Sequence, residues 1–102
     1  MANIIVTEFA GVHSQNGIQA ATGPIASQTV AIGGSTAATA NACNAATSLL
    51  LIFAEADCNV VIAASPNAST GIIIPFAANQ RDYIGIAAGS AMKVACISRT
   101  VA

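Results

Sequence analysis

The side chains that could carry out catalysis are few, and their neighbours do not support it. His13 is the only histidine, and Val12 and Ser14 beside it offer no carboxylate to orient it as a general base. Glu55 and Asp57 lie close together, but a glycosidase needs two carboxyl groups held about 5 to 9.5 Å apart across a cleft. A solvated turn explains this pair more simply. The sequence therefore predicts no catalytic residue and no enzyme.

The cysteines and the one glycine-rich stretch do not indicate a metal or a cofactor either. Cys43, Cys58 and Cys96 are widely spaced and form no CxxC pair, so we expect no zinc site. We expect reduced thiols that pack in the core, with one structural disulfide as the alternative. Gly33-Gly34-Ser35-Thr36 superficially resembles a phosphate-binding loop, but the P-loop pattern requires a lysine that is missing here. No metal and no cofactor is predicted.

Arg81, Asp82 and Tyr83 form the one compact cluster of polar functional groups. The simplest interpretation is an Arg/Asp pair in a turn, with the tyrosine capping the core. The alternative is a contact between subunits, where Arg and Tyr are the side chains that most often dominate binding. Arg81 and Tyr83 are therefore candidate interface residues.

The composition is the main clue to how the protein acts. Charged residues make up 7% of the chain, against about 25% in an ordinary soluble domain. With Lys and Arg totalling 3, no basic face exists to neutralise phosphates, so nucleic acid is not an expected partner. A surface this poor in charge stays in solution through Ser, Thr, Asn, Gln and Gly, or by packing against other subunits. We favour packing against other subunits.

A membrane segment is also not expected. No Asp, Glu, Lys or Arg occurs from Phe9 to Ala54, but polar residues and Pro24 interrupt this span throughout. A spanning helix needs roughly 20 predominantly apolar residues in a row. The N-terminal stretch MANIIVTEFAG lacks the basic region and the apolar core of a secretory signal. We expect the chain to be made and kept in a cytoplasm.

The chain of 102 residues supports one domain, residues 1–102, and its pattern is that of an all-β protein. Helical spacing is nearly absent, and short runs rich in β-branched residues alternate with turn residues. The prediction is a small antiparallel β-sandwich or a jelly-roll-like barrel with long Ala/Ser/Thr/Asn loops. The expected strands are Asn3–Phe9, Ser27–Ile32, Ser48–Ala54, Cys58–Ala63, Gly71–Phe76, Arg81–Ala87 and Ala91–Ser98.

Details of these strands predict how they are placed. SLLLIFA, residues 48–54, is apolar without a break, so both of its faces should be covered, by a second sheet or by a neighbouring subunit. Pro75 cannot donate a ladder hydrogen bond and should lie at a sheet edge or end its strand. The last two strands should form a hairpin around Gly89. Residues 10–26 and 33–47 are predicted as long loops that become ordered against other copies or a host lattice.

The second half of the chain also carries a family resemblance. IFAEADCNVVIAASPNAST and IIIPFAANQRDYIGIAAGSAMKVACIS resemble small virion structural proteins of tailed bacteriophages, over about residues 49–98. The first half, with its Ala/Ser/Thr/Asn loops, matches no pattern of that group. The matching phrases are Phe53-Ala54, Val60–Ala63, Pro66–Ala68, Pro75, Ala78–Ile86, Gly89 and Lys93–Ile97.

The resemblance implies a β-sandwich or jelly-roll-like module that is present in many copies on the virion head. The leading hypothesis is a capsid decoration or cement protein that bridges coat subunits. Its expected partners are other copies of the same chain, in a homotrimer, and the major capsid protein. Residues 1–9 are expected as an N-terminal arm or a strand, with Ile4, Ile5, Val6 and Phe9 as interface anchors. The alternative is a receptor- or carbohydrate-binding module of a head fibre, spike or tail component, which would use Arg81 and Tyr83.

Overall fold

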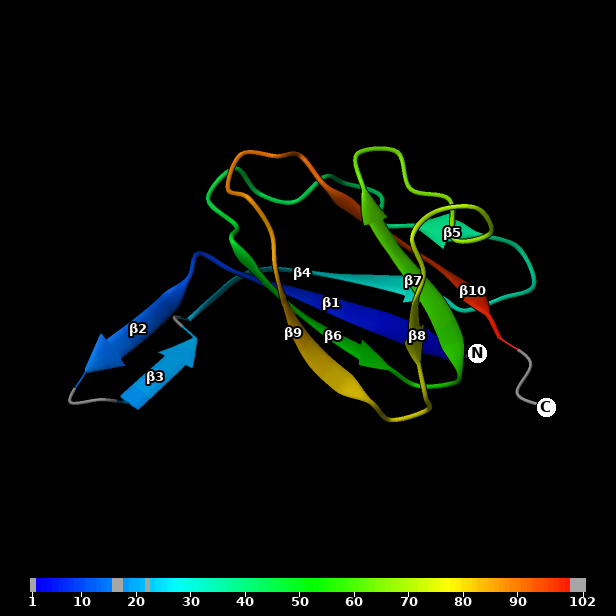
Figure 1. Cartoon of the computed structure of the whole chain (residues 1–102), viewed down its shortest axis with the longest axis horizontal. Coiled ribbons are helices and arrows are strands. Elements are labelled where there is room, and N and C mark those ends of the chain that lie inside the picture. Colours follow the sequence, from blue (N-terminus) through cyan, green and yellow to red (C-terminus); the bar gives the residue numbers. More distant parts are fainter. Residues whose placement is uncertain (1, 16–17, 22, 100–102) are drawn as a thin grey trace.

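A computed structural model describes residues 2–15, 18–21 and 23–99, of which residues 12–15 and 18–21 are described by their backbone alone. The protein is a β-sandwich of two four-stranded antiparallel sheets, which confirms the predicted all-β class (Figure 1). The first sheet has the strand order β4 (Pro24–Ala31), β1 (Asn3–Phe9), β6 (Leu49–Ala54), β9 (Arg81–Gly85). The second has the order β5 (Ala37–Ala38), β10 (Lys93–Ser98), β7 (Cys58–Ala63), β8 (Ile74–Phe76).

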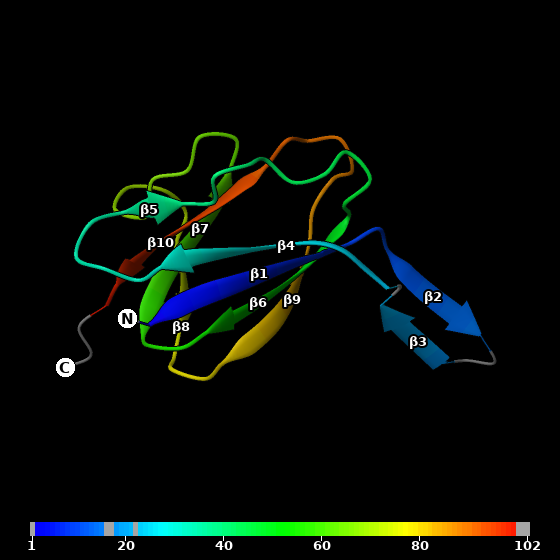
Figure 2. The same cartoon turned by 180° about the vertical axis from the view of Figure 1, so that it is seen from behind.

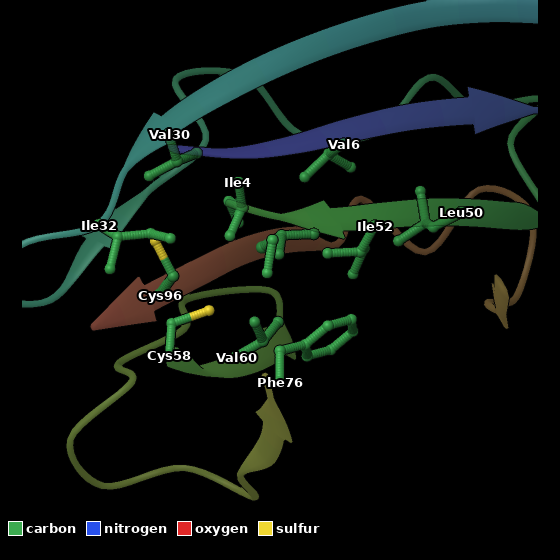
Figure 3. Close-up of a cluster of buried hydrophobic side chains, with 12 residues drawn as sticks. Ile4, Val6, Val30, Ile32, Leu50, Ile52, Cys58, Val60, Phe76 and Cys96 are labelled. Atoms are coloured by element: carbon green, nitrogen blue, oxygen red, sulfur yellow. The ribbon is translucent and has the colours of Figure 1, made fainter. Parts of the chain in front are cut away.

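The core lies between the two sheets and follows from the two-residue period of the strands. In β1 the side chains of Ile4 and Val6 point inward, and in β6 those of Leu50 and Ile52 do the same. Figure 3 shows them facing Phe76 and other side chains of the second sheet. Burying an aliphatic or aromatic side chain of this size contributes roughly 1.5–3 kcal/mol, so this layer holds the sheets together.

The outward face of the second sheet is covered by the chain itself. Ala68, in the loop of residues 64–73, packs on Val61 of β7 and Ala95 of β10, and all three are buried. The amide of Ala68 donates a hydrogen bond to Thr36 Oγ1 at 2.9 Å, which also ties this loop to the segment before β5. A Cβ at Gly71 would lie 2.6 Å from Val61 Cγ1, so only glycine allows this close approach.

The first hairpin of the chain extends beyond the end of the first sheet. β2 (Val12–Gln15) continues from β1, β3 (Ile18–Ala21) leads into β4, and the two pair with Gln15 opposite Ile18. This two-stranded ribbon projects from one end of the sandwich (Figures 1 and 2). The sequence predicts a loop over residues 10–26, whereas strands occupy much of it. Asn16-Gly17, a pair strongly favoured in two-residue hairpin loops, is the signal in the sequence for this ribbon.

The expected hairpin of residues 81–98 is wrong, although both of its strands exist. β9 pairs with β6 in the first sheet, and β10 pairs with β7 and β5 in the second. The connection between them therefore crosses from one sheet to the other, through Gly89 (φ 76°) and Ala91 (φ 54°). β10 buries Val94, Ala95 and Cys96, whereas β9 is an exposed edge strand of which only Ile84 is partly buried against the core. Pro75 lies in the edge strand β8, as predicted.

Candidate functional site

The outward face of the first sheet carries large apolar side chains from three strands, and we call it the apolar face. Residues directly opposite each other in adjacent strands point to the same side of a sheet. Ile5 of β1 lies opposite Phe53 of β6, and Leu51 of β6 lies opposite Tyr83 of β9. The apolar face consists of Ile5, Phe9, Leu49, Leu51, Phe53 and Tyr83.

Aromatic contacts organise the apolar face on both sides of Leu51. The rings of Phe9 and Tyr83 are 6.1 Å apart between centroids and inclined at 49°, a tilted arrangement that aromatic pairs favour. The Arg81 guanidinium carbon lies 5.2 Å from the centroid of the Phe53 ring, within cation–π range. Tyr83 nevertheless remains 59% exposed. The face therefore offers a pre-arranged aromatic surface with one positive charge at its edge.

Of the residues of the apolar face, only Tyr83 is exposed; Phe9 is buried, with 8% exposure, and the other four are half-buried. β6 is apolar on both sides, as LLLIFA predicts, and its inward residues Leu50 and Ile52 are packed under the second sheet. Its outward residues belong to neither of the two buried clusters. Figure 2 views the sandwich from the side of this sheet, with no other element in front of it. The sequence predicts that a second sheet or a neighbouring subunit covers each side of this strand. The second sheet covers only the inward side of β6.

Four of the six interface residues predicted from the sequence meet on this face, and two do not. Ile5 and Phe9 come from β1, and Arg81 and Tyr83 from β9, with β6 between the two strands. Ile4 and Val6 point the other way, with 0% and 1% exposure, and they are core residues. Because β1 pairs with β4 on one side and with β6 on the other, residues 3–9 are a central strand and form no free arm.

The acidic pair of the turn after β6 is used for structure. Glu55 Oε1 accepts a hydrogen bond from the backbone amide of Asn3 at 2.7 Å. Asp57 Oδ1 accepts one from the amide of Ala78 at 2.8 Å. The two carboxylates thus fix the chain at two different strand ends, as expected of a turn. The prediction on His13 concerns a side chain outside the described residues; its backbone lies in β2.

All three cysteines are free thiols, which agrees with the expected reduced thiols rather than with the alternative of a disulfide. Burial, together with the neighbouring Cys58 thiol, raises the pKa of Cys96 to about 12. Burial also raises the pKa values of Cys58 and Cys43, the latter with help from the Glu8 carboxylate. Buried neutral thiols behave as small apolar groups, so Cys58 and Cys96 fill space in the core. Among the described residues, no three His, Cys, Asp or Glu side chains are grouped to hold a metal ion.

Glu8 is a buried acid that no pattern in the sequence singles out. It is 1% exposed and lies at the end of β1 where the loop of residues 39–48 closes the sandwich. Its Oε1 accepts hydrogen bonds from the amide of Asn44 at 2.7 Å and from Thr47 Oγ1 at 2.8 Å. Both donors belong to that loop, so the carboxylate holds the loop against the strand rather than facing a ligand.

Comparison of the chain with protein-family models, with curated protein sequences and with solved structures finds no match. Within the described residues, no helix has the length and apolar character needed to cross a membrane. The features that bear on function are therefore those of the molecule itself, and the apolar face is the most prominent of them.

Proposed function

We propose that the protein is a virion structural protein of a tailed bacteriophage, a capsid decoration or cement protein that stabilises the head by bridging coat subunits. It acts by binding and performs no catalysis. The proposal rests on the family resemblance of residues 49–98, and the observation that supports it is the apolar face. A protein with so few charges and such a face suits a particle surface, where neighbouring subunits cover it.

The major capsid protein is the proposed partner at the apolar face. Leu51 and Tyr83 lie opposite each other in adjacent strands, and Phe9 supports the tyrosine ring. A rigid tyrosine held in this way is the kind of side chain that anchors interfaces, where truncation costs 2 kcal/mol or more. Each copy then needs only moderate affinity, because many copies held on one lattice bind together.

The test uses heads of the phage that encodes the chain, purified without this protein. The double variant L51T/Y83S removes apolar surface from the face, and Thr, a β-branched residue, is well tolerated in a strand. The matched control I72S/I73S removes exposed apolar surface from the loop over the second sheet. We expect wild type and control to cosediment with heads and to raise their resistance to heat, and the face variant to bind at least 10-fold more weakly.

Two results would refute the proposal at different points. If wild type does not bind heads and is absent from purified virions, the proposed role is wrong. If the face variant, shown to be folded by circular dichroism, binds as well as wild type, the apolar face is not the contact.

A receptor- or carbohydrate-binding role in a fibre, spike or tail is the second candidate, favoured by one observation. The exposed ring of Tyr83 and the guanidinium of Arg81 lie two residues apart on the same face, and sugars commonly bind to such aromatic surfaces. Glycan-array binding that is lost in both Y83A and R81A, but kept in I72S, would favour this role. Absence of any glycan signal for wild type would argue against it.

A further inference from the structure

The four edge strands of the sandwich differ in how they resist pairing with another strand. β9 carries Arg81 and Asp82, β8 is three residues long and contains Pro75, and β5 has only two residues. Charges, proline and short length are the usual features that keep an edge unpaired. β4 has eight residues, PIASQTVA, with no charge and with proline only at its first position. It is the one long edge strand of the two sheets that lacks this protection.

The backbone groups that face outward on β4 follow from its pairing with β1. The amide of Ile32 donates to the carbonyl of Ala2, next to the pair Asn3–Ala31 in the register. Since bonded and non-bonded pairs alternate in an antiparallel ladder, the even-numbered residues of β4 bond β1. The odd-numbered residues Ser27 and Thr29 therefore direct their amides and carbonyls away from the sheet.

The neighbouring loop approaches β4 through other residues. Gln28 belongs to the even set, and its side chain donates to the Asn41 carbonyl and accepts from the Asn41 amide, both at 3.0 Å. Ala31 O accepts a weak hydrogen bond from Cys96 Sγ at 3.6 Å, near the end of the strand. The central stretch at Ser27 and Thr29 is exposed, and the structure shows no bond from its outward groups to another described residue.

We propose that β4 pairs antiparallel with β4 of a second copy of this chain, around a two-fold axis at Gln28. Ser27 then lies opposite Thr29 of the partner subunit, and Thr29 opposite the partner's Ser27. These two symmetric pairs form about four backbone hydrogen bonds. The first sheets of the two copies join into one eight-stranded sheet, four strands from each.

A second copy fits this edge better than an unrelated strand does. In a two-fold contact the same surface meets itself, so each outward donor on one copy finds the equivalent acceptor on the other. Ser and Thr are compatible cross-strand neighbours, and no like charges meet. If the homotrimer expected from the sequence assembled by strand pairing, β4 would have to pair with a different edge, and each of the others is charged or short. The edge pattern therefore favours a dimer.

The size of the contact sets its expected strength. One strand pair buries less than the roughly 1,200 Å² of a standard stable interface, so the dimer should be of micromolar affinity. Sedimentation equilibrium between 5 and 500 µM should then show a reversible monomer–dimer equilibrium for the wild-type chain. This behaviour is independent of the proposed virion role, because no phage particle takes part.

Two matched charge variants test both the contact and its register. In S27K/T29K each pairing of positions 27 and 29 between copies brings two lysines together, whereas in S27E/T29K each brings a glutamate to a lysine. Both variants change the same two exposed side chains. We expect S27E/T29K to dimerise at least 10-fold more tightly than S27K/T29K, with equal far-UV circular dichroism.

A third variant, T29P, tests the contact without adding charge, in case the charged side chains perturb the strand. T29P removes an amide that faces outward and bonds nothing in its own chain, so the fold should persist while pairing is blocked. T29V, which keeps the amide, should dimerise like wild type. A wild-type chain that stays monomeric at 500 µM, a stable trimer, or equal association of the two charge variants would each overturn the proposal.

Discussion

Replacing Thr47 by Val tests whether the buried carboxylate of Glu8 holds the loop of residues 39–48 in place. Valine has nearly the same shape as threonine, so the change removes the hydroxyl that donates to Glu8 Oε1 and leaves the packing. The amide of Asn44 remains as the other donor to that oxygen. The loop then loses one of the two hydrogen bonds that it donates to Glu8, while the Ser48 amide still donates to the Phe9 carbonyl of β1 at 3.1 Å.

The expected loss of stability can be worked out from these contacts. A hydrogen bond to a charged group contributes about 1.5–3 kcal/mol, and the loss falls on a site where both residues are almost fully buried. The added methyl group of valine offsets part of this, because it buries apolar surface. We expect T47V to lower the free energy of unfolding by about 1.5–2 kcal/mol. E8Q, which keeps an acceptor oxygen without the charge, should cost less.

Urea unfolding at pH 7, followed by far-UV circular dichroism, measures this difference. T7V is the matched control, because Thr7 lies on β1 beside Glu8 but points outward, and its change should stay within about 0.5 kcal/mol. The double variant E8Q/T47V should show a coupling energy of about 1 kcal/mol, as expected of two groups in direct contact. If T47V and T7V unfold at the same urea concentration, the carboxylate does not hold the loop.

Three further outcomes follow from packing and burial. G71A should lose about 1–3 kcal/mol of stability because its methyl group meets Val61, whereas G33A, with open space around it, should lose less than 1 kcal/mol; urea unfolding compares them. In the native protein the partly exposed Cys43 should react with a thiol reagent well before the buried Cys96. The fold keeps Cys96 neutral by raising its pKa to about 12, whereas a thiol in the unfolded chain ionises near pH 8.5. The stability of the wild-type protein should therefore fall as the pH rises between these two values, and that of C96A should fall less.

The fold class could be predicted from the sequence, because runs such as residues 49–54 and 58–63 combine strand-forming side chains with clear turns on either side. Strand pairing could not be predicted as well. A short connection around Gly89 suggests a hairpin, and nothing local shows that the chain crosses between sheets there. The ribbon of β2 and β3 was within reach, since Asn16-Gly17 is a hairpin signal, but its strands are too polar to show the apolar alternation of a buried sheet.

The candidate site was predictable in part, for a reason that lies in the side chains of β1. Ile4, Ile5 and Val6 are all apolar, so the alternation that separates the two faces of a strand is missing from the sequence. Only the pairing of β1 with β6 shows that Ile5 faces outward while the other two face the core. The role of Glu8 was out of reach, because its hydrogen-bond donors lie more than 35 residues away in the chain.

The apolar face and the free edge of β4 belong to the same sheet, and this relates the two proposals. β4 is the strand next to β1, which supplies Ile5 and Phe9 to the face. Pairing β4 with its symmetry mate would place two apolar faces side by side on one continuous sheet. A partner that bound one face would then meet the second at a fixed distance, which raises the effective affinity without a new contact. Blocking the edge with T29P should therefore weaken binding to heads while each single face stays intact, whereas L51T/Y83S should weaken binding and leave the dimer in place.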